Sequence, residues 1–173
     1  MIAPDNASAP PTRTLLLGLG NPILRDDAVG LVVARALHAR LLAVGLDVDL
    51  AEASTASLDL LPIVADFASV VISDAVLVSA PQPGRVHRYD LRETPGQRTL
   101  TSLHGVGPGT ALEFGRRLGL PVPPRVVAYG IEVLDPYSFD EAMSPELVAA
   151  VPGVVHAILA AEFPTAAAPP PVV

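Results

Sequence analysis

Residues 14–30 of the chain read TLLLGLGNPILRDDAVG, an apolar run followed by a glycine-containing turn and two acids. The run Thr14–Leu19 is apolar at odd and even positions alike, which is typical of a parallel strand covered on both faces. After Asp26 and Asp27, apolar residues recur at helical spacing over Ala28–Val44. The stretch therefore predicts a strand, a loop that carries two acids, and a helix.

Short apolar strands alternate with helices through most of the remaining chain. This alternation predicts an α/β fold, a three-layer, open, mainly parallel sheet with helices on both faces. One segment, which follows the turn Pro81–Gly84, alternates sides and predicts an antiparallel edge strand. The expected strands are Asp47–Ala51, Val70–Ser73, Arg85–Leu91 and Arg125–Ile131, and the expected helices are Leu58–Ala65, Gly109–Leu118 and a C-terminal helix from Ser144 towards Phe163.

The last two helices carry more detailed expectations. In the helix that ends at Leu118, the side chains of Ala111, Phe114 and Leu118 are expected to face inward. In the C-terminal helix, Ser144 is a suitable N-cap with a proline at the first helical position. Pro152 should kink or split that helix, because proline removes a backbone hydrogen bond.

Length and composition fit one domain. The chain has 173 residues, of which 50% are hydrophobic and 17% charged, as expected of a packed protein with a sizeable core. Residues 1–12 form a Pro/Ala/Ser-rich stretch that we expect to be a flexible tail, and residues 13–163 form the single α/β domain. Residues 164–173 are rich in Pro and Ala; we expect them to extend as polyproline II and not to pack as a helix.

The charge and composition of the chain exclude several kinds of partner and site. A net charge of −7 gives no basic footprint for nucleic acid and does not favour an anionic membrane surface. The chain has no cysteine, which excludes disulfides, thiolate metal sites and a cysteine nucleophile. No apolar stretch approaches the roughly 20 residues that span a bilayer. We therefore expect a cytoplasmic monomer, with no membrane partner.

Three polar residues stand where a strand ends or a helix begins: Asp27, Asp74 and His104. In open α/β sheets, sites lie beyond the carboxyl ends of the strands, and two carboxylates with one imidazole would suit a divalent cation such as Zn²⁺ or Ni²⁺. Each residue also has a structural alternative: helix capping by the Asp26–Asp27 pair, a turn for Asp74, and a hydrogen-bonded loop position for His104.

The other three histidines are weaker candidates. His38 is expected on a helix, His87 on the edge strand and His156 in the C-terminal helix. None of these positions is expected beside the carboxyl end of a strand. We therefore do not expect them to be ligands.

The string Gly18–Pro22 admits other functions, each with a weak signal. A dinucleotide fingerprint needs glycine at position 23, where Ile23 stands. The same string opens peptidyl-tRNA hydrolases, but those continue into an Arg-His-Asn segment that this chain lacks. No G-x-S-x-G elbow of a serine hydrolase is present.

The stretch Leu15–Gly30 closely resembles the opening of the hydrogenase maturation endopeptidases. Three further segments follow in the order of that family: Val71–Ala75, which resembles its strand-end acid; Ser102–Gly105, its ligand histidine; and Tyr129–Glu132, its final strand. The resemblance spans residues 14–160. It implies that Asp27, Asp74 and His104 are the metal ligands and catalytic residues; the family often has glutamate in place of Asp27 and a glycine-richer loop in place of Glu52–Leu58.

The resemblance implies a metal-dependent endopeptidase that removes the C-terminal extension of a nickel-iron hydrogenase large-subunit precursor after nickel insertion. Asp27, Asp74 and His104 would engage the nickel of the substrate, or a divalent cation in the same place. Glu132 would contact one of these ligands or the substrate, although a solvated loop acid is the simpler interpretation. A non-catalytic metal- or nickel-sensing module on the same fold remains the alternative.

Overall fold

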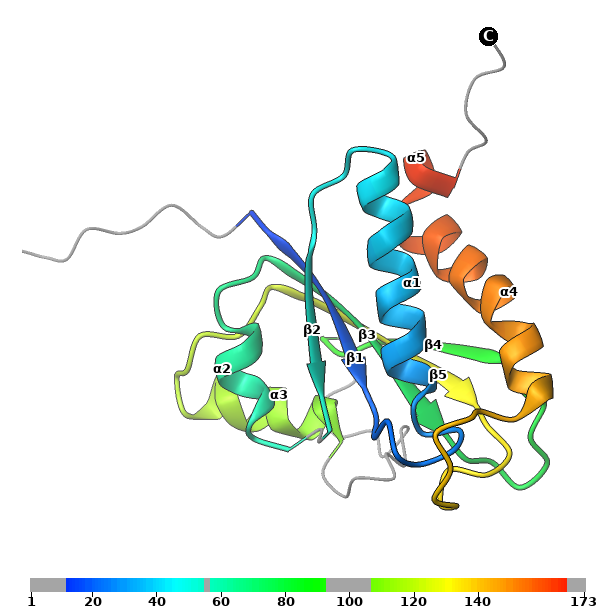
Figure 1. Ribbon diagram of the computed structural model, residues 1–173. Coiled ribbons are helices and arrows are strands. Elements are labelled where there is room, and N and C mark those ends of the chain that lie inside the picture. Colours follow the sequence, from blue (N-terminus) through cyan, green and yellow to red (C-terminus); the bar gives the residue numbers. More distant parts are fainter. Residues whose placement is uncertain (1–11, 55–56, 93–106, 168–173) are drawn as a thin grey trace, which may run out of the picture.

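The computed structural model describes residues 12–54, 57–92 and 107–167. Within these residues the chain forms a five-stranded sheet with helices on both sides (Figure 1). The strands are β1 (Thr14–Leu19), β2 (Asp49–Ala53), β3 (Ser69–Val76), β4 (Val86–Asp90) and β5 (Arg125–Glu132). The helices are α1 (Val29–Ala43), α2 (Leu60–Val64), α3 (Pro108–Arg117), α4 (Pro145–Glu162) and α5 (Pro164–Ala167).

The sheet has the order β2-β1-β3-β5-β4. Strands β2, β1, β3 and β5 run parallel, and β4 pairs antiparallel with β5 at the edge. The expected open, mainly parallel α/β sheet with one antiparallel edge strand is therefore confirmed. The carboxyl ends of β1, β3 and β5 meet at one edge of the sheet, where sites of such folds lie.

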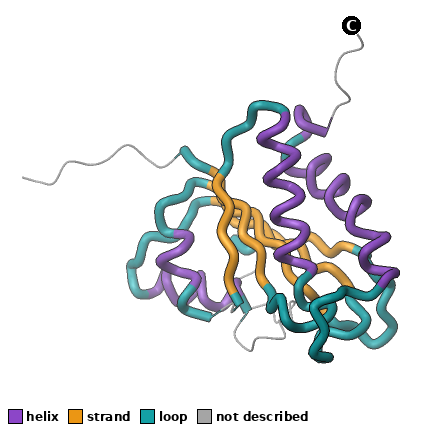
Figure 2. Tube along the Cα trace, viewed as in Figure 1, coloured by secondary structure: helices purple, strands orange, loops and turns teal. Residues whose placement is uncertain are grey.

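The side chains of alternate residues in β1 point to opposite faces of the sheet. Leu15, Leu17 and Leu19 pack on the side of α2 and α3, whereas Leu16 packs in the cluster formed with α1 and α4. Figure 2 shows the resulting layers, with α1 and α4 on one side of the strands and α2 and α3 on the other. Each fully buried leucine contributes about 1.5–3 kcal/mol. The apolar run therefore specifies a strand at the centre of a three-layer structure.

Strand β3 is longer than expected. The apolar run predicts an end at Ser73, but β3 continues to Val76, so Asp74 lies inside the strand. The extension is stabilised by β5, which pairs with β3 as far as Val76 and Glu132, whereas β1 pairs with β3 only as far as Ser73. Asp74 is thus a strand residue that lies beyond the last residue paired with β1.

Helix α3 presents a different face to the core from the expected one. Ala111 is buried as expected, but Phe114 and Leu118 are 46% and 59% exposed. Ala111, Leu112 and Gly115 face inward instead. A Cβ at Gly115 would lie 2.7 Å from a methyl group of Leu61 in α2, so the glycine lets the two helices approach closely. The buried face of α3 therefore combines small residues with Leu112, and it excludes Phe114 and Leu118.

Helix α4 begins at Pro145 with Ser144 as N-cap residue, as expected, although the Ser144 side chain makes no capping hydrogen bond. The expected split at Pro152 does not occur, because the helix runs through that residue. Pro152 and Val148, whose carbonyl the missing N–H would have bonded, are both exposed. Water can therefore hydrate that carbonyl, and the cost of the missing hydrogen bond is reduced.

The end of the described chain also differs from expectation. Residues Pro164–Ala167 form one short helical turn, α5, where we expected only extended structure. Ala166 and Ala167 pack against the core cluster of α1 and α4, which stabilises a turn too short to be stable by itself.

The expectation about apolar length was also wrong for α4. Its 18 residues, of mean hydropathy 1.3, would suffice to cross a membrane by length and composition alone. Leu147, Val154 and Ile158 of α4 are buried in the cluster with α1. These residues account for part of the apolar character of α4, of which 28% is buried inside the fold.

Candidate functional site

The loop between β1 and α1 is built around the carboxylate of Asp27. This side chain is fully buried, and its Oδ2 accepts a hydrogen bond from the backbone N–H of Asn21 at 2.8 Å. Gly20 has a φ of 147°, and a Cβ there would lie 2.0 Å from the backbone oxygen of Asp27. Gly20 therefore gives the loop its shape, and the backbone of Asn21 holds the acid in place.

The first turn of α1 packs directly on the ends of two strands. A Cβ at Gly30 would lie 2.1 Å from the backbone oxygen of Leu19 and 2.4 Å from that of Ser73. The Ser73 hydroxyl donates to the backbone oxygen of Gly30 at 2.8 Å. Because Gly30 follows Asp27 by three residues and Ser73 directly precedes Asp74, these contacts place both acids at the same edge of the sheet.

The preceding acid, Asp26, does not cap α1. The N-cap residue of α1 is Ala28, and no side chain caps the helix. The fully buried Asp26 carboxylate instead accepts four hydrogen bonds: from the backbone N–H groups of Leu134, Asp135 and Ser144 and from the Ser144 hydroxyl, at 2.7–3.1 Å. Asp26 therefore ties the β1–α1 loop to the β5–α4 loop and to the start of α4.

Asp74 is buried, with only 1% of its surface exposed, on the side of the sheet that α2 and α3 cover. It shares that side with Val70 and Ile72, which belong to the same core cluster, because alternate residues of a strand point the same way. In the β3–β5 register its neighbour is Gly130, which has no side chain. The structural alternative of a turn position for Asp74 is thus wrong, because Asp74 is a buried strand residue.

The third expected ligand, His104, lies outside the described residues. Four positions separate it in sequence from Pro108, the first residue of α3, which packs on the same side of the sheet as Asp74. Among residues 12–54, 57–92 and 107–167, no group of three or more His, Asp or Glu side chains is arranged to hold a metal ion. The three-ligand set thus remains a prediction.

A fourth acid lies at the same edge, and the simpler interpretation of it from the sequence was wrong. Glu132, interpreted from the sequence as a solvated loop acid, is the last residue of β5 and is only 3% exposed. Its carboxylate accepts from the backbone N–H of Gln82 at 2.6 Å and lies 2.7 Å from Nε2 of His87. Burial alone would raise the pKa of Glu132, but these two hydrogen bonds and the nearby Arg85 together hold that pKa below its usual value.

From the sequence, the edge-strand position of His87 does not predict a place near the carboxyl ends of the parallel strands. Since β4 runs antiparallel, its beginning lies beside the end of β5, and His87 pairs in register with Gly130. Gly130 in turn pairs with Asp74. The antiparallel direction of the edge strand, which its alternating pattern predicted, was the signal that could have brought His87 into consideration.

Three buried acids from separate parts of the chain lie at this edge: Asp27 after β1, Asp74 in β3 and Glu132 at the end of β5. Glu132 is engaged by His87 and Arg85. A buried carboxylate favours a cation beside it, and oxygen ligands suit a divalent metal. The chemistry of Asp27 and Asp74 therefore fits a metal ion, held by the protein or brought by a substrate.

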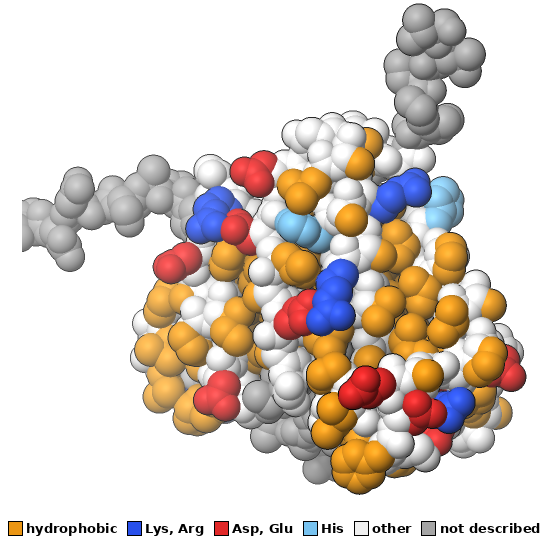
Figure 3. Space-filling model, viewed as in Figure 1, with side chains coloured by type: hydrophobic (Ala, Val, Ile, Leu, Met, Phe, Trp, Pro, Cys, Tyr) orange, Lys and Arg blue, Asp and Glu red, His pale blue; other side chains and the backbone are white. Residues whose placement is uncertain are grey.

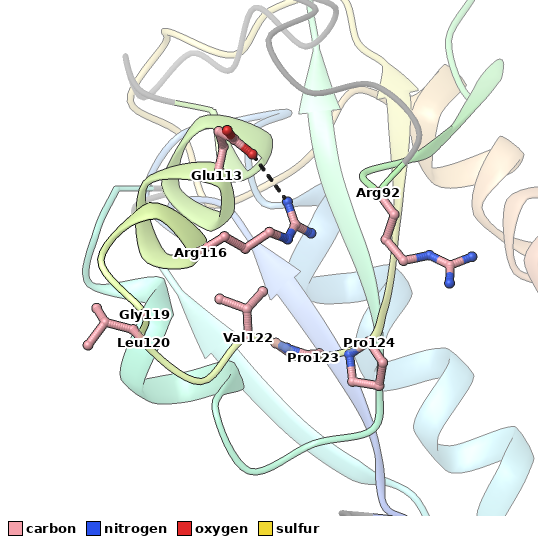
Figure 4. Close-up of a pocket in the computed structure, with 8 residues that line it drawn as sticks. All are labelled: Arg92, Glu113, Arg116, Gly119, Leu120, Val122, Pro123 and Pro124. Carbon is pink, nitrogen blue, oxygen red and sulfur yellow. Dashed lines mark ion pairs between the residues drawn. The ribbon is translucent and has the colours of Figure 1, made fainter.

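A pocket of about 540 Å³ lies elsewhere, at the beginning of β5 (Figure 4). Its lining includes Arg92, Pro124 and Arg116, and Arg116 lies 3.8 Å from Glu113. Because β5 begins beside the start of β3, this pocket is at the opposite end of the sheet from Asp74. It does not belong to the edge that carries the acids.

Comparisons with known proteins agree with the family resemblance. A family model described as hydrogenase maturation protease matches residues 31–161. The hydrogenase 2 maturation protease of Escherichia coli (strain K12) is 28% identical over 152 residues, which cover 86% of this chain and 90% of that protein. The family match begins directly after the stretch 14–30 and includes Asp74.

Two solved structures show the same fold. The hydrogenase maturating endopeptidase HybD from E. coli superposes with a TM-score of 0.70 at 23% identity, covering 89% of this chain and 94% of that one. The [NiFe] hydrogenase maturation protease HybD from Thermococcus kodakarensis gives a TM-score of 0.61 at 25% identity, covering 84% and 96%.

Proposed function

Because this chain belongs to the hydrogenase maturation protease family, we propose that it cleaves the large-subunit precursor of a nickel-iron hydrogenase and removes its C-terminal extension after nickel insertion. The reaction is hydrolysis of one peptide bond, in which water adds across the bond to give a new carboxylate and a new amine. The observation that carries the proposal is the family match over residues 31–161, together with two buried acids at the carboxyl edge of the sheet.

The proposed site is formed by Asp27, Asp74 and His104. The first two lie at one edge, fixed by the Asn21–Asp27 hydrogen bond and by the packing of α1 on Ser73. Their carboxylates suit a divalent cation, and an imidazole would complete a mixed oxygen and nitrogen set with open positions. We propose that this set engages the nickel of the substrate, or a divalent cation in the same place, and so positions the scissile bond.

The proposal also includes two further points: the protease depends on a metal ion, and it acts in the cytoplasm. A metal ion in such a site would polarise a carbonyl group or lower the pKa of a water molecule. Asp27, Asp74 and His104 would hold the ion, and the fold keeps the first two carboxylates buried. In this arrangement, contact with nickel also reports that the precursor has been loaded before the tail is cut.

The proposal is tested by incubating the purified chain with nickel-loaded and nickel-free precursor. Mass spectrometry of the large subunit should show the loss of a C-terminal peptide only for the nickel-loaded form. Asp27→Asn, Asp74→Asn and His104→Ala should each reduce processing at least a hundredfold, because a ligand set acts as a unit.

The matched control is Asp66→Asn, which changes an exposed acid between α2 and β3, at the other end of the sheet. This variant should process at the wild-type rate. Binding of the nickel-loaded precursor without any mass loss would favour the alternative function, a nickel-sensing module. Full processing by His104→Ala would remove that residue from the site.

A further inference from the structure

The β1–α1 loop, which carries Asp27, is joined along its length to the β5–α4 loop. The backbone N–H of Arg25 donates to the carbonyl of Ser138 at 2.9 Å, and the N–H of Asp140 donates to the carbonyl of Ile23 at 3.2 Å. Between these bonds an isolated antiparallel bridge pairs Leu24 with residue 139. The two loops therefore form a small ribbon at the carboxyl edge of the sheet, which Figure 1 shows as the blue and gold loops lying together.

Side chains reinforce this ribbon. The Arg25 guanidinium donates to Asp140 at 2.9 Å. The buried Asp26 carboxylate binds the N–H groups of Leu134, Asp135 and Ser144, as described above. Hydrogen bonds that tie two loops at several points reduce their freedom to rearrange. The side chains on this ribbon are consequently presented in a defined geometry.

The outer surface of the ribbon is apolar although it faces solvent. Phe139 is 83% exposed and Tyr137 62% exposed, and Ile23 and Leu134 are also exposed. We call these four residues the two-loop patch. Figure 3 shows hydrophobic side chains gathered with acidic ones over the lower part of the molecule, where these loops lie. An aromatic side chain held in solvent on a fixed loop contributes little to folding, and such residues are typical anchors of protein interfaces.

We propose that the two-loop patch docks the folded body of the hydrogenase large-subunit precursor, so that the precursor's tail reaches Asp27 and Asp74. This inference rests on the proposed function. Continuity with the site identifies the occupant, because one loop of nine residues, 20–28, carries both Ile23 of the patch and Asp27 of the site. A protein that places a peptide bond at Asp27 must cover the neighbouring side chains.

The charges around the two-loop patch specify the complementary surface. Asp140 is partly exposed beside Arg25, and Glu141 and Glu146 are exposed nearby in sequence. The partner surface should therefore be apolar at its centre with basic residues at its rim. A hydrophobic centre supplies affinity, and complementary charges raise the association rate and select the partner.

The test measures binding separately from cleavage. The affinity of the full chain for the purified precursor is measured by biolayer interferometry, and processing is followed by mass spectrometry. Phe139→Ala should weaken binding about tenfold or more, as removal of an interface anchor does. It should leave thermal unfolding unchanged, because so exposed a ring loses few contacts. Phe139→Tyr, which keeps the ring, should bind nearly as wild type.

The control is Phe114→Ala, which removes an exposed phenylalanine from α3 on the other side of the sheet. It should bind and process as wild type. Equal affinity of Phe139→Ala and wild type would overturn the docking proposal, and so would an equal loss in Phe114→Ala. A dimer of the chain alone that Phe139→Ala converts to monomer would assign the patch to self-association and likewise overturn it. If the wild type binds through Phe139 but never cuts, the proposed function fails while the docking surface stands.

Discussion

Replacement of Asp26 by alanine should be among the most destabilising single changes in the chain. The carboxylate is fully buried and accepts from three backbone N–H groups, those of Leu134, Asp135 and Ser144, and from one hydroxyl. Leaving a buried donor without an acceptor costs about 1–3 kcal/mol, and only the N–H of Ser144 is fully buried. The buried Ser144 N–H carries the full cost and the part-buried N–H groups of Leu134 and Asp135 carry less, so together they predict a loss of about 3–5 kcal/mol.

Urea unfolding, followed by circular dichroism at equilibrium, measures this loss directly. For a domain of this size, the loss corresponds to a fall of roughly 10 °C in Tm. The control is Asp140→Ala, which removes a part-exposed acid of the same ribbon that is paired with Arg25; it should cost less than about 1 kcal/mol. If Asp26→Ala lost no more than this control, the argument that Asp26 holds the two loops together would be wrong.

Two further predictions concern packing and pH. Gly30→Ala would place a methyl group 2.1 Å from a backbone oxygen of β1, which cannot move aside, so this variant should not fold. Gly153 lies in α4 with nothing within 4 Å of its added Cβ, so Gly153→Ala should instead raise the free energy of unfolding by about 0.5–1 kcal/mol. Urea unfolding measures both changes. The Glu162 side chain is fully buried; burial opposes its ionisation, but hydrogen bonds from Tyr129 and two arginines outweigh burial and lower its pKa. Its stabilisation should be complete above the usual glutamate pKa of 4.5 and be lost as pH falls through the lower folded pKa. Glu162→Gln should therefore be less stable than wild type at neutral pH and should lose less stability as the pH falls below 4.5. If the urea midpoints of variant and wild type fell equally below pH 4.5, the prediction would be wrong.

The sequence by itself specified the elements whose signal is local. Strand β1 begins and ends at the expected residues, Thr14 and Leu19, because a central parallel strand must be apolar on both faces. The alternation over Arg85–Leu91 identified the edge strand β4 and its antiparallel direction. The order of these signals along the chain sufficed for the fold class, and the stretch 14–30 sufficed for the family resemblance.

Only the tertiary structure decided which side chains meet. Asp26 binds N–H groups more than a hundred positions away, and Glu132 contacts His87 across two antiparallel strands, so neither role leaves a pattern in its own neighbourhood. Local periodicity likewise misjudged Phe114, because the face of α3 that packs is set by close approach to α2. A hydrophobicity pattern indicates which residues favour burial. It does not indicate which distant segments will form hydrogen bonds or pack closely, because these contacts exist only once the chain has folded.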